Sequence, residues 1–261
     1  IKLQSFCTLF WLLLIKYFEL GALKMKEILA HIEKRKQEFA KLPLFEYMRD
    51  TSIDPRQRLV WVPCAAPFVM TFRDLNRYDL RKESTTDVIQ ELINRHTYED
   101  ESHWIWFLED LEKLGFNQSL KFSESLKFLW GKETYRIRQV CHQIALHTFD
   151  KEPTVVLAGI EAIEETGNIT FGTTAQVVEE LQKMTQKNYL YFGRKHFDVE
   201  NGHAMGTDDI EKFLIQIKFT DDQKKQSFEL VDKIFEVFTL AVNEFMVYTQ
   251  KHSLEYQALS L

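Results

Sequence analysis

The sequence predicts an all-α protein, on three observations. Only 9 glycines and 5 prolines occur among 261 residues, whereas 21 residues are phenylalanine, which favours long helices packed through aromatic side chains. Apolar residues recur at helical spacing through most of the chain, and helix-capping residues precede several of these runs. No segment alternates polar and apolar residues as a half-buried strand does. We therefore expect long helices that pack against one another.

Charge and cysteine content exclude some classes of protein. The formal net charge of -6, with no basic run interleaved with aromatic residues, argues against nucleic acid as a partner. Cys7, Cys64 and Cys141 lie far apart and form no Cys-x2-Cys pair, so we expect buried thiols in a cytoplasmic protein. The length suits one domain, which we place over residues 25–261.

Residues 1–24 differ from the rest of the chain. The apolar run from Phe6 to Ile15 is too short to cross a bilayer and lacks a small-residue cleavage site, so we expect no membrane partner. Three interpretations stay open, namely a signal peptide, an amphipathic packing or membrane-surface helix, and a segment that does not belong to the natural protein. Met25 resembles an ordinary start.

The first half of the domain contains three predicted helices. The pattern over residues 25–41 predicts an amphipathic outer helix that Pro43 stops. Residues 59–72 predict a core helix broken by two prolines. Ser84 and Asp87 form a helix-capping pattern, from which we expect one uninterrupted helix up to Gly115.

The second half continues in the same way. We expect a loop with a short helix over residues 118–131 and a helix over residues 132–150. An apolar helix begins near Thr154, breaks at Gly167–Gly172 and is followed by a separate helix to Lys187 that Thr173 caps. Thr207 and Thr220 cap two further helices, the last of which runs to about His252.

The chain repeats one spacing of potential metal ligands. The triplet His96, Asp100 and His103 has the pattern His-x3-Asp-x2-His, and the triplet His196, Glu200 and His203 has the pattern His-x3-Glu-x2-His. Positions i, i+4 and i+7 of a helix lie within about 60° of one another, so each triplet directs two imidazoles and a carboxylate to one side. The repeat indicates one shared metal site.

A further carboxylate is expected from the apolar helix near residue 160. Glu161 interrupts this helix without a local basic partner, and an ionised carboxylate is costly to bury unless it is paired. A metal ion shared with the two triplets is the natural partner. Glu161 is the first candidate and Glu164 the second.

The order of these ligands resembles a known family. A histidine helix (His96 to His103), a glutamate helix (Glu161) and a closing His-x3-Glu-x2-His helix resemble the haem-oxygenase-like diiron oxidases and oxygenases. The phrases Glu99–Gly115 and Tyr191–His196 are similar to members described only as iron-containing redox enzymes. The resemblance covers roughly Leu59 to His252. It implies a haem-oxygenase-like bundle of about seven helices that binds two non-haem iron ions.

One position departs from that family. Its first metal helix typically presents a carboxylate seven residues before the histidine, whereas His96 stands seven residues before His103. Either the His96 imidazole replaces the carboxylate or Asp100 takes over its role. We predict that His96 and His103 are ligands and that Asp100 supports them.

The sequence therefore predicts a non-haem iron oxidoreductase. Imidazole and carboxylate donors suit iron, with manganese as the alternative metal. The expected partners are dioxygen and a small, partly apolar substrate, and nothing in the pattern opposes a homodimer. Two other hypotheses stay open. One is a metal-free ligand-binding or cofactor-processing protein on the same scaffold, and the other is a structural protein that requires metal.

Overall fold

The structure is a computed structural model that describes residues 25–117, 119–203 and 217–252, without the side chains of residues 200–203. Every element in these ranges is helical, which confirms the predicted all-α class. The elements are a helix over residues 25–39, α2 (Pro43–Arg49), α3 (Pro55–Arg58), the 3-10 turn η1 (Val62–Ala65), α4 (Ala66–Asp74), the π-helical η2 (Leu75–Leu80), α5 (Val88–Asp100), α6 (His103–Lys113), α7 (Phe122–Leu129), the 3-10 turn η3 (Lys132–Thr134), α8 (Tyr135–Thr148), α9 (Pro153–Thr185), α10 (Arg194–His203) and α12 (Asp221–His252).

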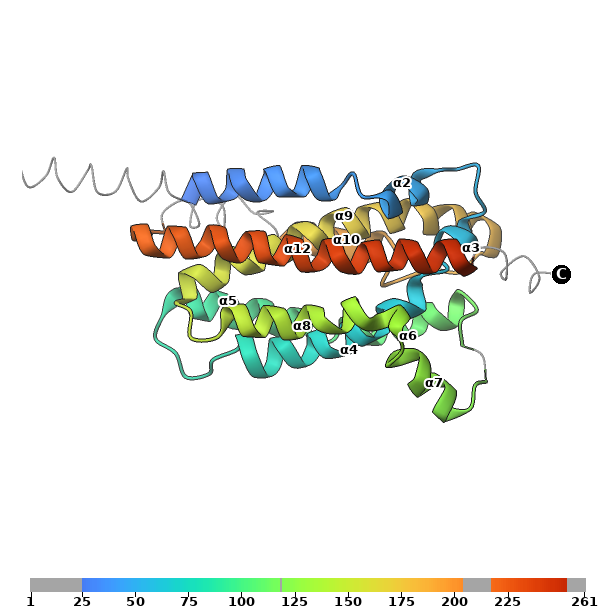
Figure 1. Cartoon of the computed structure of the whole chain (residues 1–261), viewed down its shortest axis with the longest axis horizontal. Helices are drawn as coiled ribbons and strands as arrows, with labels where there is room; N and C mark the ends of the chain where they lie inside the picture. The colour runs from blue at the N-terminus through green and yellow to red at the C-terminus, as the bar shows by residue number, and fades with distance from the viewer. Residues whose placement is uncertain (1–24, 118, 204–216, 253–261) are drawn as a thin grey trace, which may run out of the picture.

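The helices lie along one long axis in two layers (Figure 1). The helix over residues 25–39, α9, α10 and α12 form one layer, α4, α5, α6 and α8 form the other, and α7 leans out from one end. The layers meet on the apolar stripe of α12, where Phe238 packs against Phe68 of α4 at a ring-centroid distance of 5.4 Å. Within the first layer, Phe235 of the same stripe packs against Phe39 at 5.9 Å. Among the described helices, none is both long and apolar enough to span a membrane.

Two helix starts show why the chain folds as it does locally. At the start of α12, Thr220 Oγ1 accepts the backbone N–H of Gln223 at 3.1 Å, and Gln223 Oε1 accepts the backbone N–H of Thr220 at 2.9 Å. This reciprocal capping box confirms the predicted start. At the start of α5, the Asp87 carboxylate accepts the N–H groups of Ile89 and Gln90, so Asp87 is the cap. The predicted cap at Ser84, with Asp87 inside the helix, is therefore wrong.

The predicted uninterrupted helix up to Gly115 is wrong. The chain turns at Glu101 and Ser102, so α5 ends at Asp100 and a separate helix, α6, begins at His103. Tertiary contacts hold the turn, because the Arg81 guanidinium binds Thr97 Oγ1 at 3.0 Å and the Glu101 carboxylate at 2.8 Å. The predicted end is confirmed, since Gly115 takes a φ of +86° just after α6, as a helix-terminating glycine does.

The predicted break at Gly167–Gly172 is also wrong. α9 runs without interruption from Pro153 to Thr185, and Thr173 Oγ1 bonds to the Ile169 carbonyl at 2.8 Å instead of capping a new helix. Burial outweighs the low helix propensity of glycine here, because the helix packs along α12 and α10. Gly159 permits that packing, since a Cβ there would lie 2.7 Å from Leu230 Cδ2.

Candidate metal centre

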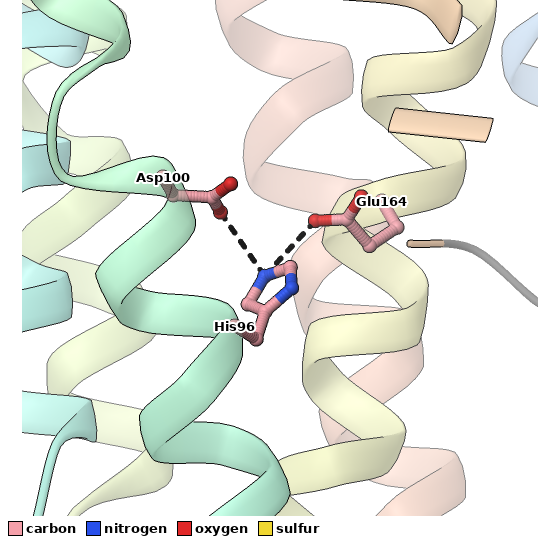
Figure 2. Close-up of side chains that lie close together, drawn as sticks. All are labelled: His96, Asp100 and Glu164. Carbon is pink, nitrogen blue, oxygen red and sulfur yellow. Dashed lines mark ion pairs between the residues drawn. The ribbon is translucent and has the colours of Figure 1, made fainter. Parts of the chain in front are cut away.

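α5 and α9 bring three potential ligands together. The His96 Nε2 atom lies 3.0 Å from Asp100 Oδ2 and 3.1 Å from Glu164 Oε1, so the imidazole stands between the two carboxylates (Figure 2). Asp100 follows His96 by one helical turn, and Glu164 approaches from α9. The donor atoms of all three residues lie within 4.8 Å of one another. This group fits one metal ion.

The three buried glutamates of α9, Glu161, Glu164 and Glu165, differ in their surroundings. Glu164 faces His96, whereas Glu165 pairs with the Lys36 ammonium at 2.6 Å. Glu161, the first candidate from the sequence, is not in the group around His96. Burial raises the pKa of Glu161 to about 7, the charge of His96 opposes this shift, and Glu165 adds to it.

The charge on His96 follows from its two carboxylate neighbours. Burial by itself would lower the pKa of the imidazole. The charges of Asp100 and Glu164, and the hydrogen bonds to them, outweigh burial and hold the pKa of His96 well above its usual value. Without a bound metal, the two neighbouring carboxylates therefore favour the protonated form of the His96 imidazole.

A second pair of potential ligands lies beside the first group. The His196 Nε2 atom of α10 lies 3.0 Å from the His103 Nδ1 atom at the start of α6. The other ring nitrogen of His196, Nδ1, lies 2.8 Å from the Tyr191 carbonyl oxygen. A carbonyl oxygen can only accept, so Nδ1 carries the proton, and Nε2 of the neutral ring keeps a lone pair directed at His103.

Asp100 lies between the two groups. Its Oδ2 atom approaches His96, and its Oδ1 atom lies 3.8 Å from His103 Nδ1. The break between α5 and α6 produces this arrangement, because Asp100 ends one helix and His103 begins the next. One carboxylate therefore reaches toward both sets of donors, which is the placement of a ligand that bridges two ions.

A residue that the sequence analysis did not consider positions His196. The Asp110 carboxylate of α6 is fully buried and accepts the backbone N–H groups of Leu190, Tyr191 and Phe192 at 2.9, 2.8 and 3.0 Å. Burial raises the pKa of Asp110, and these three hydrogen bonds and Lys113 oppose the rise. The sequence does contain one indication of this role, since Asp110 stands seven residues after His103 and therefore on the same face of α6.

Aromatic rings surround the two histidines. Trp106 stacks on His103 with a centroid distance of 4.7 Å and an interplanar angle of 17°, and Phe171 lies 3.9 Å from the His196 ring. These contacts restrict the rotation of both imidazoles, because a ring packed against its neighbours cannot turn without displacing them.

A cavity of about 100 Å³ adjoins the site. Asp100, His103, Glu164 and His196 form part of its wall, and most of the remaining wall is apolar. Besides the two histidines, the aromatic residues of that wall are Phe45, Trp61, Phe68, Phe72, Trp104, Phe171, Tyr191, Phe192, Phe238 and Phe245. The potential ligands therefore form part of the wall of a small, mostly apolar space.

The structure thus brings together five of the eight predicted metal ligands, namely His96, Asp100, His103, Glu164 and His196. Glu161 lies on α9 one turn before Glu164. Glu200 and His203 belong to α10, but their side chains lie outside the described residues, so their predicted role as ligands stays a prediction. Searches against protein-family models and against curated proteins found no match to this chain.

Proposed function

We propose that this chain is a non-haem iron oxidoreductase, with two iron ions on a haem-oxygenase-like bundle, that uses dioxygen to oxidise a small organic substrate. One observation carries the proposal. The Asp100 carboxylate lies between the donors of His96 and Glu164 and those of His103 and His196, at the wall of an apolar cavity.

The spacing of the donors supports metal binding. Two ligand atoms that each lie about 2.1 Å from one ion in neighbouring coordination positions are about 3 Å apart. The separations of His96 Nε2 from Asp100 Oδ2 and of His196 Nε2 from His103 Nδ1 are both 3.0 Å. Each pair could therefore bind one ion with little movement.

The type of donor supports iron, with manganese as the alternative. Imidazole and carboxylate ligands suit both metals, whereas thiolates would favour zinc or an iron–sulfur cluster. Of the described cysteines, Cys64 and Cys141 are free and buried, and neither lines the cavity. Iron bound at such a site supplies redox chemistry with dioxygen.

The protein's own residues would orient the ligands and exclude water. The hydrogen bond from His196 to Tyr191 leaves Nε2 available as a ligand atom, and Asp110 holds the segment that carries the Tyr191 carbonyl. The apolar wall favours a substrate with little charge. Glu161, with a pKa of about 7, can hold or release a proton beside the site at neutral pH.

Metal analysis and oxygen uptake test the proposal together. Protein purified under iron supplementation should contain about two iron ions per chain, and the reduced protein should consume dioxygen. His103→Ala should lower both quantities, whereas His147→Ala, on α8 and away from the cavity, should change neither. Wild-type protein that binds neither iron nor manganese would contradict the proposal.

One observation favours a second candidate function, a metal-free protein that binds a small apolar ligand. A protonated His96 imidazole would offset one of the two carboxylate charges of Asp100 and Glu164 without a metal ion. In that case the affinity of the cavity for a small aromatic probe would be the same before and after a chelator has removed any bound metal. Under the iron proposal, chelation should change the affinity, because the ion would form part of the cavity wall.

A further inference from the structure

A separate pocket, of about 360 Å³, lies along α9 and shares no lining residue with the cavity at the metal centre. One side of α9, which includes Asn168, forms part of its wall. The rest of the wall includes Lys36 of the first described helix, Arg49 at the end of α2 and Arg194 at the start of α10. Three cationic side chains from three different helices therefore surround one side of α9.

Asn168 lines this pocket with an amide that is only half satisfied. The residue is 8% exposed, and its Nδ2 group donates to Glu165 Oε2 at 3.2 Å. This bond fixes the orientation of the amide, because the carboxylate of Glu165 pairs with Lys36 and can only accept. The Oδ1 atom then has no hydrogen-bond partner among the described residues. Since a buried oxygen is costly to leave unpaired, a bound molecule that donates a hydrogen bond to it would be favoured.

Arg49 supplies the unpaired positive charge of the pocket. The Lys36 ammonium pairs with Glu165 at 2.6 Å, and the Arg194 guanidinium pairs with Asp198 at 3.0 Å. Arg49 is exposed and forms no ion pair with any residue that the structure describes. A guanidinium binds a carboxylate through two parallel hydrogen bonds, and one unpaired cation matches a ligand with one negative charge.

The Arg49 guanidinium and the Asn168 amide lie toward the same end of the pocket. The Arg49 Nη1 atom donates to the Ala40 carbonyl oxygen at 3.1 Å, and Ala40 follows Lys36 by one helical turn, since its N–H bonds to the Lys36 carbonyl at 2.9 Å. Lys36 and Asn168 in turn contact the same Glu165 carboxylate. A ligand of a few atoms can therefore meet both a cation and an unpaired acceptor.

We propose that this pocket binds a small hydroxycarboxylate, with its carboxylate on Arg49 and its hydroxyl group donating to Asn168 Oδ1. A hydroxyl suits the acceptor better than an ammonium, because an ammonium would lie among the cations of Lys36 and Arg49. Glu179, an acidic residue of the same wall, stands eleven positions after Asn168, about 16 Å along the helix. It is too distant to repel the carboxylate.

Two matched pairs of acids test the proposal by calorimetric titration of the full chain. Lactate should bind roughly tenfold more tightly than propionate, or 3-hydroxybutyrate more tightly than butyrate by the same factor, because only the hydroxy acid satisfies Asn168. The affinities should be the same before and after a chelator has removed any bound metal. This comparison matters because hydroxy acids can themselves bind iron.

Two variants separate the contacts. Arg49→Ala should weaken both acids of a pair by roughly tenfold, since both present a carboxylate. Asn168→Ala should lower the affinity for the hydroxy acid to that of its matched partner and leave the partner unchanged. Arg56→Ala, on α3 and outside the pocket wall, is the control for Arg49 and should change neither affinity. Circular dichroism checks that each variant is folded.

Four results would overturn the inference. The first is wild-type protein that binds neither hydroxy acid more tightly than its matched partner. The second is alanine, the amino acid, binding more tightly than lactate. The third is a folded Asn168→Ala variant that keeps the full preference for the hydroxy acid. The fourth is a preference that chelation abolishes, since the acid would then bind the metal. The iron proposal is independent of all four, because the two sites share no lining residue.

Discussion

The Nδ1–H group of His196 donates a hydrogen bond to the Tyr191 carbonyl oxygen over 2.8 Å, and this bond decides which nitrogen of His196 faces His103. The carbonyl itself is held in place, because the segment from Leu190 to Phe192 donates three N–H groups to the Asp110 carboxylate. A chain of hydrogen bonds thus connects a buried carboxylate of α6 to a candidate metal ligand of α10.

Replacing Asp110 should therefore weaken metal binding without removing a ligand. Asp110→Ala leaves three backbone N–H groups without their acceptor, so we expect a loss of about 3 kcal/mol in the free energy of unfolding. We also expect an iron affinity roughly 10–100-fold lower, since His196 loses its fixed orientation. Urea denaturation and metal titration measure the two effects. Glu109→Ala, an exposed neighbour, is the control, and equal iron affinity in the two variants would show that Asp110 does not position His196.

His96→Ala and Asp100→Ala should lose different amounts of metal. Asp100 reaches toward both donor groups, so Asp100→Ala should lower the content at both sites, whereas His96→Ala should empty only the site shared with Glu164. Elemental analysis of protein purified under iron supplementation gives the stoichiometries. Asp74→Ala removes a mostly exposed carboxylate and should have no effect. If His96→Ala and Asp100→Ala lose metal equally, Asp100 does not bridge the two sites.

The stability of the metal-free protein should depend on Glu161 in a specific pH range. Burial raises the pKa of Glu161 from 4.5 to about 7, so the folded state binds the proton more tightly than the unfolded state. Its contribution to stability is complete below pH 4.5 and is lost as the pH rises through about 7, with a total of at most about 3 kcal/mol. Glu161→Gln, which stays neutral, should be more stable than the wild type at pH 8 and close to it at pH 5.

Urea denaturation at both pH values measures this difference. The exposed Glu179→Gln serves as the matched control and should show no such dependence on pH. An equal stability of Glu161→Gln and wild type at pH 8 would mean that Glu161 ionises without cost, which its burial opposes.

Two glycines of α9 should respond in opposite directions to alanine. At Gly167 a Cβ would lie 3.6 Å from the Phe171 ring, an ordinary contact, so the better helix propensity of alanine should stabilise the protein by roughly 0.5–1 kcal/mol. At Gly159 a Cβ would lie 2.7 Å from Leu230, so Gly159→Ala should lower stability by about 1 kcal/mol through overpacking. Thermal denaturation compares the two variants. A loss of stability at Gly167 would indicate that α9 is broken there.

The sequence by itself determined the helical class, several helix ends and the types of donor. These depend on local chemistry, as in the capping box of Thr220 and Gln223 and the left-handed turn at Gly115. Imidazoles and carboxylates at spacings of four and three residues predicted a metal site at His96, Asp100 and His103, and that site stays a prediction.

Only the tertiary structure decided how the donors are arranged. Helical periodicity cannot show that Arg81 binds Glu101 and holds the chain in a turn there, because the two residues lie far apart in the sequence. Nor can it show that packing on α12 keeps α9 helical through Gly167, because that contact joins two different helices. The turn makes Asp100 and His103 ends of two helices rather than members of one face. Likewise, Glu164 rather than Glu161 contacts His96. The packing of the buried faces of α9 sets the rotation of the helix about its axis, and this rotation selects Glu164. Burial alone does not distinguish the two glutamates, because both are buried.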